Sequence, residues 1–231
     1  MTNGNTAGKR VAPWGYTVLV LLPLAAGSAA SAYQHTLEHV SLPGVSDRLS
    51  AYFAVLVEEW LAVFLVWLQA RRGGPSIREL VSGGWPKAGA FLRDMGLAIG
   101  FLTVAVPLEA LMTRWLGASD DGISFLPKSR LEAVVWVVLA ATAGFAEELI
   151  FRGFLTWQFQ AWTKSSALAI VLQGLLFGLA HGYYSRSMLT IAVYGCLLGW
   201  LAWWRKSLRP GMLAHLLEDE VFGLLAFTMT K

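Results

Sequence analysis

The chain has 231 residues, of which 56% are hydrophobic and only 14% are charged, against about 45–50% and about 25% in an ordinary soluble domain. Its mean hydropathy is +0.54 and its net charge is +3. The Lys and Arg residues lie between apolar stretches rather than in one basic patch. The composition therefore predicts a polytopic membrane protein, and it argues against a soluble enzyme, a disordered chain or a protein that binds nucleic acid.

Seven apolar stretches are each close to the roughly 20 residues that a helix needs to cross a bilayer. We therefore predict an all-α fold, in which residues 1–231 form one integral membrane domain, a bundle of about seven transmembrane helices. The fourth stretch also allows one long tilted helix to about residue 163, or a break at Gly144 or Gly153. The stretches cover residues 16–33, 51–70, 94–116, 131–155, 166–183, 188–204 and 211–229.

The first stretch has a second interpretation. Lys9 and Arg10 precede it and small residues follow it at 29–32, as in a secretory signal with its cleavage site. We favour a first membrane span, because many first spans have this composition. Between the predicted spans, eleven Lys and Arg residues fall on the N-terminal side of the membrane and six on the other. This bias predicts a cytoplasmic N-terminus.

The fourth stretch contains Glu147, Glu148 and Arg152. A charge inside a bilayer costs about 2.5–3.5 kcal/mol on insertion scales, so each of these side chains needs a reason to be there. Glu148 and Arg152 are four residues apart and share a helix face, which favours an ion pair. Glu147 lies about 100° around the helix and has no counter-ion nearby on its own helix. Such a carboxylate is suited to accept a proton from water.

Two more stretches bring histidines into the membrane. In the fifth, His181 follows Phe177 by four residues and lies beside glycines at 174, 178 and 182, which form a smooth strip where another helix can approach closely. In the seventh, His215 and Asp219 are four residues apart on one helix face. Buried structural pairs would explain any one of these stretches, but ionisable residues in three of them favour a functional site.

Together these residues resemble the CPBP family, the CAAX-protease and bacteriocin-processing intramembrane proteases. Its pattern is E-E-x-x-x-R, then F-x-x-x-H, then H-x-x-x-N or H-x-x-x-D on successive helices. Residues 131–220 carry all three motifs in order, with Asp219 where Asn is common. They match through Glu147, Glu148, Arg152, Phe177, His181, His215 and Asp219.

The resemblance implies an endopeptidase that cleaves a lipidated or membrane-embedded peptide, near the C-terminus of that peptide. It implies that Glu147 activates the attacking water and that His181 positions it. It further implies that His215 and Asp219 stabilise the oxyanion, and that Arg152 supports the glutamates. Asp219 departs from the commoner amide, and a carboxylate beside an oxyanion helps only if it is protonated or acts through His215.

We expect no metal cofactor, because no two candidate ligands form a compact zinc motif. The alternative is a divalent ion such as zinc, held by Glu147, Glu148, His181 and His215. The depth of the site raises a difficulty. Glu147 lies about 24 Å from residue 131, and His181 about 23 Å from residue 166 on the opposite membrane face. In straight spans they would not meet, so the fourth helix must be tilted or broken, or it must begin well outside the core.

Other residues suggest other functions. Glu58, Glu59 and Glu109 lie within predicted spans and are compatible with a small transporter or channel. Residues 35–39 read H-x-x-E-H, the inverted zinc-protease motif, but they lie in a short segment after the first span, so we treat the match as coincidence or as an interfacial helix. Cys196 is the chain's single cysteine, which forbids an internal disulfide, and we interpret it as a small apolar residue.

Overall fold

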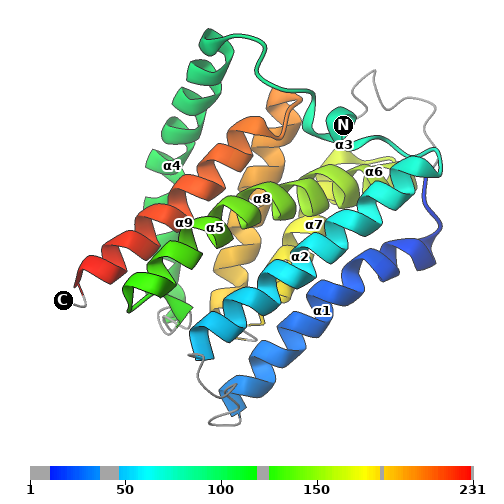
Figure 1. The fold of residues 1–231 in the computed structure, drawn as a ribbon. Coiled ribbons are helices and arrows are strands. Elements are labelled where there is room, and N and C mark those ends of the chain that lie inside the picture. The colour runs from blue at the N-terminus through cyan, green and yellow to red at the C-terminus, as the bar shows by residue number, and fades with distance from the viewer. Residues whose placement is uncertain (1–10, 37–46, 119–124, 183–184, 230–231) are drawn as a thin grey trace.

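The computed structural model describes residues 11–36, 47–118, 125–182 and 185–229, and the regular secondary structure of this part of the chain is helical, with no strand. The prediction of an all-α fold is therefore confirmed. The helices form a bundle in which α4 leans away from the rest (Figure 1). The elements are α1 (Trp14–Thr36), α2 (Asp47–Arg71), α3 (Ile77–Val81), α4 (Ala88–Leu116), α5 (Arg130–Glu147), the π-helix η2 (Glu148–Leu155), α6 (Thr156–Thr163), α7 (Ser166–Ala180), α8 (Ser187–Arg205) and α9 (Arg209–Met229).

The predicted membrane spans all fall on helices. Four helical segments are long and apolar enough to cross a membrane, namely Arg48–Arg71, Ala88–Leu116, Arg130–Thr163 and Ser187–Arg205. Two shorter apolar helices, Trp14–Ala30 and Ser166–Ala180, cover the first and fifth stretches, and α9 covers the seventh. Large apolar side chains are exposed around the bundle, such as Trp115, which is 82% exposed. A surface of this kind is suited to lipid, as in an integral membrane protein.

The fourth predicted span is one continuous helix of 34 residues, Arg130–Thr163. It does not break at Gly144 or Gly153, so the long-helix alternative is correct. Its middle section, η2, is π-helical, and there the Thr156 hydroxyl donates to the Phe151 carbonyl oxygen, five residues earlier, at 2.9 Å. π-helical segments of this kind often lie at functional sites.

This extension to Thr163 removes the depth difficulty. α6 and α7 pack side by side and are joined by a short turn. Glu147 lies 16 residues before Thr163, and His181 lies 15 residues after Ser166. At 1.5 Å per residue the two side chains are about 24 Å and about 23 Å from the same turn, and hence at the same depth. The error in the sequence argument was to end the fourth span at residue 155.

Two glycines on α7 let α8 approach closely. A Cβ on Gly174 would lie 2.9 Å from the Ala192 carbonyl oxygen, and a Cβ on Gly178 would lie 2.5 Å from the Met188 carbonyl oxygen. This contact confirms the predicted glycine strip for these two positions. Gly182, the third, follows the end of α7 and has a φ of 72°, so it serves the turn instead.

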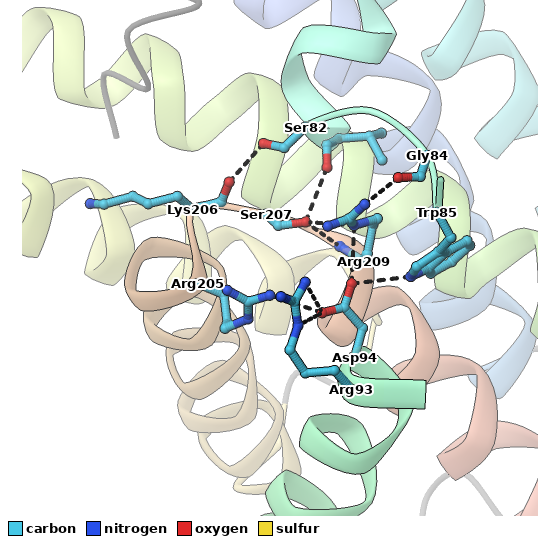
Figure 2. A network of polar contacts seen from close by, with 10 residues as sticks. Ser82, Gly84, Trp85, Arg93, Asp94, Arg205, Lys206, Ser207 and Arg209 are labelled. Atoms are coloured by element: carbon cyan, nitrogen blue, oxygen red, sulfur yellow. Dashed lines mark hydrogen bonds and ion pairs between the residues drawn. The ribbon is translucent and has the colours of Figure 1, made fainter. Parts of the chain in front are cut away.

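A buried aspartate ties α4 to the turn between α8 and α9 (Figure 2). Asp94 is fully buried, and its carboxylate lies 2.9 Å from Arg205 Nη2 and 3.1 Å from Arg209 Nε. The Trp85 indole donates to it at 3.1 Å, and Arg93 reaches it at 3.4 Å. We call these five residues the Asp94 cluster. Because Arg209 is the first residue of α9, the cluster fixes where the helix that carries the predicted site histidine begins.

Candidate active site

Glu148 contacts two other predicted site residues, Arg152 and His215. It is completely buried at the start of η2, and its Oε1 lies 3.1 Å from Arg152 Nη1, as the four-residue spacing predicts. The same oxygen lies 3.2 Å from His215 Nδ1 on α9. Gly211 makes room for this carboxylate, since a Cβ there would lie 2.9 Å from Glu148 Oε2. Glu148 therefore joins the fourth span to α9.

The His215 imidazole lies among three carboxyl groups. Its Nδ1 faces Glu148, while its Nε2 lies 3.7 Å from Glu147 Oε2 and 3.7 Å from Asp219 Oδ2. The close approach of α5 and α9 makes this possible, because a Cβ on Gly144 would lie 3.0 Å from the Met212 carbonyl oxygen. With Nδ1–H donated to Glu148, the ring directs Nε2 toward Glu147, the carboxylate predicted to act as base.

The second histidine is held by its own helix. His181 directly follows α7, and its Nδ1 lies 2.8 Å from the Phe177 carbonyl oxygen, to which it donates when protonated there. The Phe177 ring lies edge-on to both histidines, with centroids 4.7 Å from His181 and 5.9 Å from His215. The Arg152 guanidinium lies over the same ring at 3.9 Å. The Phe177 ring therefore packs against both imidazoles and the arginine and helps to hold them in place.

The four residues predicted as catalytic line one cavity of about 410 Å³. Glu148, Arg152 and Phe177 lie behind its wall, in the supporting places that the motifs imply. The rest of the wall is mainly apolar and comes from α1, α2, the segment before α5, α5, η2 and the end of α7. The cavity is lined by Leu24, Gly27, Ser28, Val55, Glu58, Glu59, Phe125, Leu126, Trp136, Leu139, Ala140, Ala143, Glu147, Phe151, Ala180, His181, His215 and Asp219.

Sequence reasoning assigned two cavity residues to another function. Glu58 and Glu59 were noticed as charges within a span, but no motif linked them to the histidines, and they line the same cavity. Glu109, the third carboxylate of the transporter alternative, lies elsewhere, within side-chain hydrogen-bond reach of Glu218. The three carboxylates of that alternative therefore do not share one place in the structure.

Trp136 was missed, although it places the backbone of Asp219. Its indole Nε1 donates to the Asp219 carbonyl oxygen at 2.9 Å, and the missing side chain of Gly223 leaves room for the indole. Trp136 lies 11 residues before Glu147 in an apolar helix, and nothing in the sequence distinguishes it from a lipid-facing tryptophan.

Cys196 is not among the residues that line the cavity. Cys196 packs between α7 and α8, with its Sγ 3.7 Å from the Ile170 carbonyl oxygen. Of the H-x-x-E-H segment, His35 lies in the last turn of α1, while Glu38 and His39 fall outside the described residues.

Within the described residues, no three Asp, Glu, His or Cys side chains are arranged to hold a metal ion. The zinc alternative named Glu147, Glu148, His181 and His215. These four do lie near one another, but Glu148 is already engaged by Arg152 and His215.

A helical membrane protein whose glutamates and histidines converge on one cavity has the architecture expected of an intramembrane protease. Residues 129–220 match the family model described as type II CAAX prenyl endopeptidase Rce1-like. This part of the chain is similar to that family, in agreement with the resemblance found in the motifs, and the similarity indicates a CAAX-type protease. The matched segment runs from the N-cap of α5 into α9, and it includes all three motifs.

Among other proteins, the chain is 28% identical over 141 residues to one from Bacillus subtilis (strain 168), described as uncharacterized protein YpbD. The alignment covers 57% of this chain and 70% of the relative. No solved structure gives a significant match.

Proposed function

We propose that this protein is a glutamate-dependent intramembrane endopeptidase. It hydrolyses a peptide bond near the C-terminus of a lipidated or membrane-embedded substrate. The observation that carries the proposal is the convergence of Glu147, His181, His215 and Asp219, from three separate membrane helices, on one cavity. The match of residues 129–220 to the CAAX prenyl endopeptidase family supports the reaction class.

In the proposed mechanism Glu147 is the general base. It accepts a proton from a water molecule that His181 helps to position, and the water oxygen attacks the scissile carbonyl carbon. The carbonyl electrons move to oxygen, which becomes the oxyanion of the tetrahedral intermediate. Glu147 then donates its proton to the amide nitrogen as the C–N bond breaks, and it is restored as a carboxylate.

His215 is the proposed oxyanion donor. The hydrogen bond from its Nδ1–H to Glu148 leaves Nε2 on the side of the cavity, where a protonated ring offers an N–H to the developing charge. Asp219 Oδ2, 3.7 Å from Nε2, acts through this ring by favouring its protonated form. Direct contact between that carboxylate and the oxyanion would be repulsive, so Asp219 serves as a positioning residue.

The apolar side chains of the cavity wall are compatible with an apolar substrate. Leu24, Val55, Leu126 and Leu139 contribute side chains to it, which suits a membrane-associated prenylated peptide of the kind on which CAAX proteases act. We also propose that the N-terminus is cytoplasmic. That orientation places the arginines of the Asp94 cluster on the cytoplasmic side, in agreement with the positive-inside rule.

The mechanism proposed here uses no metal. Its test is metal analysis of the purified protein together with activity after treatment with a chelator. We expect full activity without stoichiometric metal. Loss of activity that zinc restores would replace this mechanism with a metal-dependent one.

Glu147→Gln tests the assigned base. The protein is reconstituted in phosphatidylcholine liposomes, and cleavage of a farnesylated CAAX peptide bearing a fluorophore and a quencher is followed. We expect Glu147→Gln to lower kcat by about 10²–10⁴-fold with little change in thermal stability. Glu220→Gln, the same change on α9 outside the cavity lining, is the matched control and should keep full activity. Full turnover by Glu147→Gln would refute the assignment.

A further inference from the structure

Glu59 is a buried acid that the mechanism above does not use. It lies on α2, outside the segment that matches the family, and it is only 1% exposed although it lines the cavity. Neither of its carboxyl oxygens has an N–H or O–H donor among the described residues. Burial of an acid this deeply without a hydrogen-bond donor costs free energy. The groups around Glu59 must therefore explain how the fold tolerates it.

The group facing Glu59 is the carboxyl of Glu147, which lies within side-chain hydrogen-bond reach. The other charged groups near Glu59 are also acidic, namely Glu58 on its own helix and Asp219 on α9. The two imidazoles that line the cavity are those of His181 and His215, and His215 Nε2 lies 3.7 Å from Glu147 Oε2. The polar side chain that α1 contributes to the lining is Ser28. Of the residues that the structure describes, no Lys or Arg lines the cavity.

Two carboxylates within hydrogen-bond reach of each other repel in an apolar cavity, and both offer only acceptor atoms. One proton shared between them removes the repulsion and supplies the missing donor. The protonated oxygen of one group then donates to the carboxylate of the other. Pairs of carboxyl groups that share one proton are an established arrangement in hydrolytic sites.

From this geometry we infer that Glu59 is a positioning residue for the base. It holds one proton and donates a hydrogen bond to the Glu147 carboxylate, which orients that group toward the water. The inference rests on the proposed function. In the proposed cycle the pair begins with one proton, holds two after Glu147 deprotonates the water, and returns to one when the amine leaves. No further proton donor is required.

The packing of α1 keeps α2 in place for this contact. The Glu58 carboxyl fills the space left by the missing side chain of Gly27, with which a Cβ would overlap. The Ser28 hydroxyl on α1 donates to the Leu179 carbonyl oxygen on α7 at 2.9 Å. α1 and α2 are thereby tied to the helix that carries His181, and Glu59 stays within hydrogen-bond reach of Glu147.

The test compares two substitutions in the liposome assay with the farnesylated peptide. Glu59→Gln keeps a hydrogen-bond donor that no longer depends on a proton, whereas Glu59→Leu removes it. We expect Glu59→Gln to retain kcat within about tenfold and to lose one alkaline limb of the pH profile. Glu59→Leu should lose about 10²-fold in kcat at every pH. A limb that persists in Glu59→Gln belongs to the histidines.

Three outcomes separate the possibilities. An unchanged alkaline limb in Glu59→Gln, or full activity in Glu59→Leu, overturns the role of Glu59 if Glu147→Gln is inactive. Full activity in Glu147→Gln overturns the proposed function itself. An activity-independent measurement is the infrared carbonyl band of protonated carboxyl groups. A shared proton predicts that Glu59→Gln and Glu147→Gln alter the same band, and two independent bands, or none, would contradict it.

Discussion

Replacing Arg152 by methionine should destabilise the protein severely. Arg152 and Glu148 are both completely buried and 3.1 Å apart. Removal of one member of a buried ion pair costs about 3–5 kcal/mol, because the other charge is left uncompensated. His215 still faces Glu148 at 3.2 Å and offsets part of this loss, while the guanidinium contact with the Phe177 ring, worth up to about 2 kcal/mol, disappears. We therefore expect a net loss of about 3–5 kcal/mol.

For a chain of this length each kcal/mol corresponds to roughly 2–4 °C in melting temperature, so Arg152→Met should melt about 6–20 °C lower. The chain supplies its own probe. Cys196 is its single cysteine, half-buried between α7 and α8, and unfolding in detergent can be followed by its reaction with a fluorogenic maleimide. The wild-type protein and Glu220→Gln serve as references.

The double variant Glu148→Met with Arg152→Met is the decisive control. Apolar residues of similar size often replace a buried ion pair without loss of stability. The double variant should therefore recover most of the melting temperature while it remains inactive. The ion pair does not stabilise the fold as argued if Arg152→Met melts within about 2 °C of wild type. The same conclusion follows if the double variant is as unstable as the single one.

Two further substitutions test the supports of the site. Asp94→Asn removes the carboxylate that binds Arg205 and Arg209, and we expect a loss of about 2–3 kcal/mol, below the range for fully buried pairs because Arg205 reaches solvent; an unchanged melting temperature would contradict this. Gly223→Ala places a methyl group against the Trp136 indole and should lower kcat by about 10²-fold by displacing Asp219. Gly96→Ala, where a Cβ meets nothing within 4 Å, is its control, and equal activity of the two glycine variants would refute the role of Trp136.

Local spacing in the sequence was sufficient to predict the ion pair and the helix contact. Glu148 and Arg152 are four residues apart, and the helix geometry that this implies is the geometry found. Gly174 and Gly178 likewise mark the contact with α8 because small residues at this spacing form a groove on a helix. Each of these features depends on residues within one helix, so the sequence contains the whole signal.

Features that join distant parts of the chain were not predictable in the same way. Asp94 and Arg205 are 111 residues apart, and each alone looks like an ordinary charge near a span end. Glu59 meets Glu147 only because α2 packs against α5, which no motif records. The length of the fourth helix was uncertain because residues 156–163 are more polar than the span before them, and composition alone placed the boundary too early.

The cavity is lined by residues from two separate segments of the chain. The residues of the three motifs come from the segment that matches the family, whereas α1 and α2, which precede that segment, supply Glu58, Glu59 and part of the apolar wall. Substitutions in the first 71 residues can therefore change the shape of the cavity while every motif stays intact. Exchange of the α1–α2 hairpin between related chains is a direct route to new substrate preferences, and motif comparison alone would not detect such a difference.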